Sequence, residues 1–220
     1  MSYITHGMAN KALHEMSLFY YDLQQLHKKH GLDLESDLGR RNVILSTAQE
    51  KFFGRAISEA GHQVETDGRT GQSDIVVILD DGSRRELECK LTTRNSAGGI
   101  VFQTDHATLE KKGELDYLYV IADADFQSFA VLHFERLTTE DFRYPAAGSR
   151  GKVSMLKHSC YDRCRILFGD YRRVNDRHIR AIEEQLAGNI RPKKRAQLES
   201  RLEYWRADPG HFEVSLNIVA

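Results

Sequence analysis

The feature that most constrains the fold is the stretch from Ser73 to Leu91, SDIVVILDDGSRRELECKL. A β-branched run over 74–79 leads into Asp-Asp-Gly-Ser, which is typical of a tight turn, and an alternating segment over 85–91 follows. This order predicts a β-hairpin. Because successive side chains of a strand point to opposite faces, the second strand has an apolar face and a charged face. Its charged face carries Glu86, Glu88 and Lys90.

The length of the turn decides which side chains of the hairpin face each other. With a two-residue loop, Asp74 faces Cys89. With a three-residue loop over 80–82, in which Gly82 adopts a left-handed conformation, Asp74 instead lies opposite Glu88, with Cβ atoms about 5 Å apart. We predict the three-residue loop, because only this register sets the two carboxylates across from each other.

Two facing carboxylates repel each other unless a cation lies between them. Mg²⁺ suits such a pair, because it binds one or two carboxylates and keeps water and phosphate oxygens as its other ligands. Lys90 projects from the same face, where its ammonium can orient water and offset charge that develops on a phosphate. The hairpin therefore predicts a Mg²⁺ site at Asp74 and Glu88 and a catalytic role for Lys90. The alternative is a surface hairpin with a solvated charged face.

These residues resemble the signature of the PD-(D/E)XK nuclease superfamily, which includes many type II restriction endonucleases. Asp74 matches the single acid, and Glu88-Cys89-Lys90 matches the E-x-K. The proline that often precedes the acid is Ser73 in this chain. The strand-turn-strand context strengthens the match, and the resemblance covers about residues 46–135.

The resemblance implies an α/β fold with a central mixed β-sheet flanked by helices, built on an αβββαβ core. It implies a sequence-specific type II restriction endonuclease that cleaves double-stranded DNA as a homodimer and leaves a 5′-phosphate. It also implies that the backbone carbonyl of Cys89 joins Asp74 and Glu88 as a metal ligand, and that Mn²⁺ substitutes for Mg²⁺. Two other functions stay open: a repair or recombination nuclease that recognises DNA structure, and a nuclease-like module that binds nucleic acid without cutting it.

A helix predicted from Ser46 or Thr47 to Ala60 precedes the hairpin. Glu50 lies three residues before Phe53, on the stripe that this helix would bury, and a buried carboxylate needs a partner. In the resembled family a helix before the acid strand often carries a glutamate into the active site, and we expect Glu50 to be that residue. The alternative is a capping box, Thr47-x-x-Glu50, in which Glu50 binds the start of the helix.

The remaining pattern predicts one domain of residues 1–220, with a core over about 46–170, an N-terminal helical arm over 1–45 and a C-terminal helical segment over 171–220. The arm contains an amphipathic helix over 8–30, whose apolar stripe includes Phe19 and Leu26. The other predicted elements are strands over 100–103, 115–122, 128–134, 152–156 and 212–219, and helices over 104–112, 175–187 and 192–207.

Charge is distributed unevenly along the chain. The net charge is −1, but residues 143–206 hold 16 Lys/Arg against 7 Asp/Glu, a balance of +9. A basic block in an otherwise acidic chain indicates a surface that faces a polyanion, although a solvated helical face has the same composition. We expect DNA contacts from the cluster within this block and from the polar loop after the hairpin, and Gln103 can line the same site. The expected DNA-binding residues are Arg94, Asn95, Lys193, Lys194 and Arg195.

The composition is ordinary for a globular protein, with 40% hydrophobic and 29% charged residues. No apolar run reaches the length of a membrane span, and the N-terminus lacks the apolar core of a signal peptide. Three cysteines, at 89, 160 and 164, do not suggest a disulfide framework. We therefore expect a cytoplasmic protein with no membrane contact.

Overall fold

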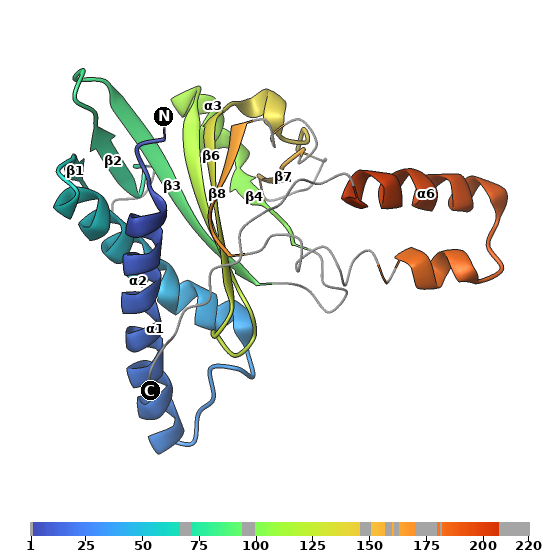
Figure 1. Cartoon of the computed structure of the whole chain (residues 1–220), viewed down its shortest axis with the longest axis horizontal. Coiled ribbons are helices and arrows are strands. Elements are labelled where there is room, and N and C mark those ends of the chain that lie inside the picture. Colours follow the sequence, from blue (N-terminus) through green and yellow to red (C-terminus); the bar gives the residue numbers. More distant parts are fainter. Residues whose placement is uncertain are drawn as a thin grey trace.

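Helices cover both faces of one mixed sheet (Figure 1). The computed structural model describes residues 2–66, 72–93, 100–145, 151–156, 160, 163–169, 180 and 182–206. The sheet has six strands, which lie side by side in the order β1 (Gln63–Glu65), β2 (Ile75–Ile78), β3 (Arg84–Thr93), β5 (Leu115–Ala122), β6 (Phe129–Leu137) and β8 (Cys164–Phe168).

The two faces of this sheet are covered by different elements. One face packs against α1 (His6–Lys29) and α2 (Leu38–Glu59), which form an antiparallel pair. The other face is covered by a shorter layer. That layer consists of the two-stranded sheet β4 (Gln103–Asp105) and β7 (Lys152–Ser154), α3 (His106–Lys112) and the 3-10 helix η1 (Thr139–Asp141).

The hairpin of β2 and β3 has the predicted three-residue register. Ile75 pairs with Leu87, which places Asp74 opposite Glu88. The loop closes with a hydrogen bond of 2.9 Å from the Leu79 N–H to the Ser83 carbonyl. Gly82 has a φ of 78°, the left-handed conformation that the three-residue turn requires.

The centre of the sheet confirms a mixed α/β architecture. β3 and β5 are parallel and are joined by a connection that contains α3, whereas β1–β2–β3 and β5–β6–β8 pair antiparallel. Every residue of β5 is buried. Its side chains alternate between the two cores: Leu118 and Val120 face α1 and α2, and Tyr117 and Tyr119 face the layer of α3. Burial on both faces explains why this strand has an almost continuous apolar sequence.

The helix before the hairpin begins about eight residues earlier than predicted. α2 starts after Asp37, whose side chain accepts a hydrogen bond from the Arg40 N–H at 3.0 Å. Thr47 therefore lies inside the helix, where its hydroxyl donates to the Ile44 carbonyl at 3.2 Å. The alternative of a capping box between Thr47 and Glu50 is excluded, because Thr47 is not at a helix start.

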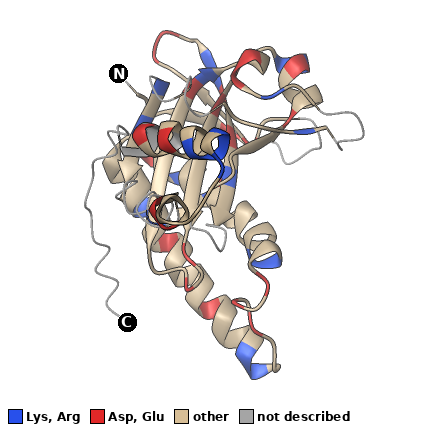
Figure 2. Ribbon diagram, turned by 90° about the vertical axis from the view of Figure 1, so that its right-hand side faces the viewer, with Lys and Arg blue, Asp and Glu red and all other residues tan. Residues whose placement is uncertain are grey.

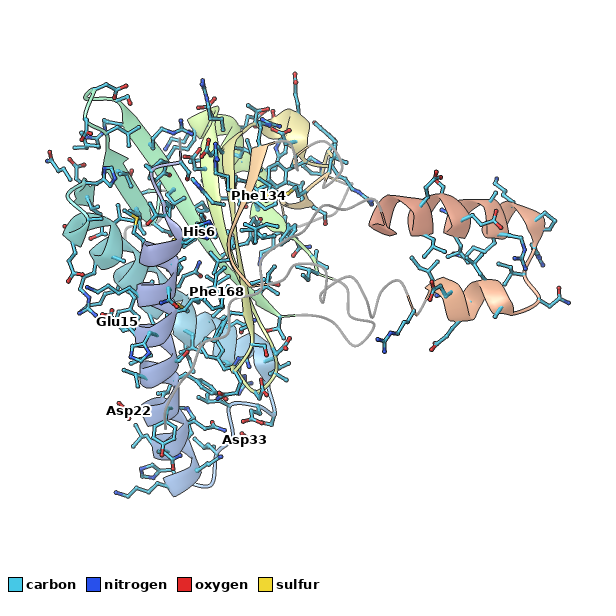
Figure 3. All side chains as sticks on the ribbon, in the orientation of Figure 1. His6, Glu15, Asp22, Asp33, Phe134 and Phe168 are labelled. Atoms are coloured by element: carbon cyan, nitrogen blue, oxygen red, sulfur yellow. The ribbon has the colours of Figure 1, made fainter. Side chains whose placement is uncertain are left out.

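The predicted apolar stripe of α1 is only partly buried. Phe19 is 39% exposed and Leu26 is 54% exposed, whereas Leu13 and Tyr20 are buried. α1 packs against both α2 and the sheet, so the face that it buries is wider than a single apolar stripe. That face includes Tyr20, which the predicted stripe did not contain. Figure 3 shows the start of the helix beside β8, where His6 Nδ1 lies 2.8 Å from the Leu167 carbonyl.

The short strands β1 and β8 were not predicted, and the expected strand over 100–103 begins at Gln103.

A small helical hairpin, formed by residues 182–187 and α6 (Pro192–Arg206), stands to one side of the sheet (Figure 1). Its apolar contacts join Ile182 to Leu198 and Leu202, as the helical spacing predicts. The strand expected over 212–219 lies outside the described residues. No helix in the described part of the chain is long and apolar enough to cross a membrane.

Candidate active site

The candidate site lies where β3 continues past the end of β2. β2 pairs with β3 only as far as Leu87, whereas β3 stays paired with β5 as far as Thr93. Asp74, the residue before β2, turns its carboxylate into the gap, where Oδ2 accepts a hydrogen bond from the Cys89 N–H at 2.7 Å. The Asp74 side chain thus takes the place of the next bond in the strand ladder.

The backbone of Cys89 faces the same gap. In an antiparallel pair, residues that exchange hydrogen bonds alternate with residues that do not, and the N–H and C=O of one residue point to the same side. The Leu79 N–H donates to the Ser83 carbonyl, so residues 79 and 83 are a hydrogen-bonded pair. The odd-numbered residues of β3, Cys89 among them, therefore direct both their N–H and their C=O toward β2. The Cys89 carbonyl therefore points toward the side from which the Asp74 carboxylate approaches.

Glu88 and Lys90 form an ion pair on the face of β3 that lies away from α1 and α2. Lys90 Nζ is 2.5 Å from Glu88 Oε1, and the two side chains are 31% and 16% exposed, respectively. Burial alone would lower the pKa of the Lys90 ammonium. The adjacent Glu88 carboxylate raises it by more, so the pKa of Lys90 lies above its ordinary value. Lys90 is therefore a charged hydrogen-bond donor at neutral pH.

Asp74 and Glu50 are both half-buried acids with raised pKa values. Burial, followed by the Glu88 carboxylate, raises the pKa of Asp74 to about 7. Burial also raises the pKa of Glu50, whose charge interacts with those of Lys90 and Glu88. α2 thus brings the charge of Glu50 within reach of the hairpin residues, and Glu50 lines the same hollow as Asp74. The site as a whole has more negative than positive charge.

Two hydrogen bonds to Glu86 fix the chain just before Asp74. Ser73 is buried, and its hydroxyl donates to Glu86 Oε2 at 2.5 Å. The same oxygen accepts a hydrogen bond from Lys112 Nζ at 2.5 Å, from the end of α3. Ser73 stands where the pattern of the resembled family often has proline. A proline ring would restrict the backbone at this position, and here the hydrogen bond from Ser73 to Glu86 restrains it instead.

The carboxylates fit a hard divalent cation. Asp74 uses Oδ2 to bind Cys89 and Glu88 uses Oε1 to bind Lys90, so each has a second oxygen with no hydrogen bond to a described residue. Those two oxygens and the Cys89 carbonyl match Mg²⁺, which takes one or two carboxylates. Across the described ranges, no group of three or more His, Cys, Asp and Glu side chains is arranged to hold a metal ion. Water and phosphate oxygens would have to complete the coordination shell.

Two hollows flank the carboxylates. The wider one, with a volume of about 830 Å³, is lined mainly by α2, and both Glu50 and Asp74 are among its lining residues. The smaller one has a volume of about 320 Å³, and Glu88, Lys90 and Gln103 are among its lining residues. A polymer that passes over the carboxylates therefore has room on either side, and Gln103 lies at the site as expected.

Those of the expected DNA-binding residues that the structure describes do not lie at this site. Arg94 and Asn95 lie outside the described residues. Lys193, Lys194 and Arg195 are exposed on α6, in the hairpin that stands apart from the sheet. A run of three basic residues stands at the start of α6, and acidic residues follow farther along the helix (Figure 2). The Arg195 guanidinium donates to the Leu186 carbonyl at 3.1 Å, so this residue also stabilises the helical hairpin.

Sequence reasoning missed one basic residue that the fold brings to the site. Lys152 lies on β7 and lines the smaller hollow together with Glu88 and Lys90. It belongs to the basic block over 143–206, but no local pattern distinguishes it from the other cations of that block.

No protein-family model matches the chain, and no curated protein shows significant similarity to it. The interpretation of the site therefore depends on its geometry.

Proposed function

We propose that this chain is a Mg²⁺-dependent endonuclease that hydrolyses phosphodiester bonds of double-stranded DNA, as a sequence-specific type II restriction enzyme. The observation that carries the proposal is the register of the hairpin. It sets Asp74 opposite Glu88, at the open edge of β3, with Lys90 on the same face. Glu50 adds a third acid from the preceding helix.

The order of the elements supports this proposal. Leaving out β4, which belongs to the two-stranded sheet, the chain runs through α2, β1, β2, β3, α3 and β5, and β3 and β5 are parallel neighbours. This is the order that an αβββαβ core requires. The basic block and the two hollows beside the carboxylates also suit a long polyanion that crosses the site.

The proposed chemistry assigns one task to each group. Bound Mg²⁺ would polarise the phosphodiester and lower the pKa of water. Asp74, Glu88 and the Cys89 carbonyl would hold the cation, and Glu50 would orient the attacking water. Lys90 would donate a hydrogen bond to a phosphate oxygen and offset its developing charge. In-line attack by water forms a new P–O bond and breaks the bond to the 3′ oxygen, which takes up a proton, so a 5′-phosphate and a 3′-hydroxyl result.

A cleavage assay on long duplex DNA tests the proposal. We expect discrete fragments on a gel when the purified protein is incubated with phage-sized DNA and Mg²⁺ or Mn²⁺. Ca²⁺ should support DNA binding with little turnover, as the family resemblance implies. EDTA should stop cleavage, since two carboxylates and a carbonyl cannot replace the cation.

The pattern of products separates the proposal from its rivals. Cleavage of branched or flapped DNA without discrete fragments from linear duplex would indicate a repair or recombination nuclease. Binding of DNA with no cleavage under any divalent metal would indicate a non-catalytic module. A protein that neither binds nor cuts DNA would contradict all three functions.

The basic cluster on α6 gives a separate prediction. Replacing Lys193, Lys194 and Arg195 by alanine should flatten the dependence of log K on log salt, by roughly one unit for each phosphate that the variant no longer binds. DNA binding is measured at a series of salt concentrations for the parent and for the triple variant. An unchanged slope would mean that the cluster is a solvated helix end.

A further inference from the structure

We infer that the smaller hollow is a phosphate-binding subsite for the nucleic-acid strand, with Lys152 as its contact residue. The inference rests on the proposed nuclease function and names a binding residue for it. The hollow measures about 320 Å³, which is at the lower end of the range for ligand sites. Its lining comes from β3, β4, β5, β7 and the chain before β4, and includes Glu88, Lys90, Thr92, Gln103, Asp105 and Lys152.

The pairing of β4 with β7 brings Lys152 to this place. Lys152 lies directly across from Asp105, and Ser154 lies across from Gln103. β4 leads straight into α3, which belongs to the connection that returns the chain to β5. The two-stranded sheet is therefore fixed beside the face of β3 that carries Glu88 and Lys90.

Lys152 forms no ion pair with another residue in the described part of the chain. Its opposite neighbour Asp105 uses Oδ1 to accept a hydrogen bond from the Thr108 N–H at 2.9 Å, which caps α3. Lys90, by contrast, is paired with Glu88. Lys152 is exposed and makes no ion pair with a described residue, so its ammonium can bind an incoming anion without first breaking such a pair.

The face of β3 provides a path from the carboxylates to this cation. Glu88, Lys90 and Thr92 share that face, at intervals of about 7 Å along the strand. Thr92 and Gln103 add hydroxyl and amide donors, which commonly bind phosphate oxygens of nucleic acids. Glu88 and Asp105 place negative charge in the same hollow, which disfavours a multiply charged free phosphate. A phosphodiester of a strand whose neighbouring phosphate lies at Asp74 and Glu88 is the occupant that these charges favour.

The test compares DNA binding and cleavage by the parent, Lys152→Ala and Lys152→Arg. Binding is measured with Ca²⁺ against salt concentration, and initial cleavage rates are measured with Mg²⁺ over a range of DNA concentrations. We expect Lys152→Ala to lower the slope of log K against log salt by about 0.9, the effect of one phosphate contact on duplex DNA. It should raise KM and leave the saturated rate close to that of the parent. Lys152→Arg should restore the slope, because it keeps the charge.

Lys29→Ala is the matched control, since Lys29 is an exposed lysine in the last turn of α1, away from the hollow. A parent that cuts DNA, together with a Lys152→Ala variant that keeps the parental slope and KM, would overturn the subsite and leave the nuclease proposal standing. A parent that neither binds nor cuts DNA would overturn both. A thermal melt of each variant checks the fold. If the alanine variant unfolds, Lys152→Gln replaces it in the test, because glutamine removes the charge and keeps a long side chain.

Discussion

Lys90→Ala is expected to slow DNA cleavage by roughly 10²–10⁴ while leaving metal binding and DNA binding in place. The ammonium of Lys90 has no lone pair for a metal, so its loss does not remove a ligand. It removes the donor that lies 2.5 Å from Glu88 and would offset charge on the phosphate. The measurement is single-turnover cleavage with Mg²⁺, beside a DNA-binding titration with Ca²⁺.

Glu88→Ala is the companion variant, because it should lose cleavage by a different route. It removes one of the two carboxylates that would hold the cation, so excess Mg²⁺ or Mn²⁺ should restore part of its activity. The same excess should not rescue Lys90→Ala. Cleavage by Lys90→Ala at the parental rate would show that the E-x-K match is a coincidence.

Asp116→Ala is expected to destabilise the protein by about 3 kcal/mol, because it breaks a buried charged network. Asp116 is almost fully buried on β5. Its carboxylate accepts hydrogen bonds from the Tyr3 hydroxyl at 2.8 Å, the Arg85 guanidinium at 2.5 Å and the Arg136 N–H at 2.7 Å. The His133 ring lies 3.8 Å away. Removing the carboxylate would leave Arg85 without its partner in a largely buried place.

The free energy of unfolding in urea measures this effect. Glu114→Ala is the control, because it removes an exposed ion pair with Arg136 and should cost less than about 1 kcal/mol. Equal destabilisation by Asp116→Ala and Glu114→Ala would mean that the buried network adds nothing to stability.

The same network predicts how stability depends on pH. Burial alone would raise the pKa of Asp116, but His133, Arg85 and the Arg136 N–H outweigh it and lower the pKa from 3.8 to about 2. A carboxyl group with a depressed pKa stabilises the folded state fully above its ordinary pKa. Its contribution, about 2 kcal/mol, is lost as the pH falls from about 4 to about 2. The stability difference between the parent and Asp116→Asn should therefore shrink over this range, and a constant difference would contradict the assignment.

The hairpin at the candidate site is determined by its own residues. The turn Asp80-Asp81-Gly82 selects the three-residue loop, because Gly82 can adopt the left-handed conformation without strain. That loop fixes which residues of β2 and β3 face each other, and hence places Asp74 opposite Glu88. The buried strand β5 and the cap of α3 at Asp105 were also predictable, since burial pattern and capping are local properties.

The start of α2 could not be predicted from periodicity. Arg41 is fully buried in the part of the helix that was missed. Its guanidinium donates to the carbonyls of Asp123 and Ala124 at 3.0 and 2.5 Å, in the turn between β5 and β6. A charged residue on the buried face breaks the apolar pattern, and the carbonyls that make its burial favourable lie more than eighty residues away.

The sequence by itself determined the pair of carboxylates and the adjacent lysine, because these follow from alternation and turn geometry over a few residues. Only the tertiary structure decided which other side chains join them. Packing of α2 on the sheet brings Glu50 to Asp74, and pairing of β4 with β7 brings Lys152 to Lys90. Such placements depend on which faces are buried against each other across long separations in the chain, and no local pattern encodes that choice.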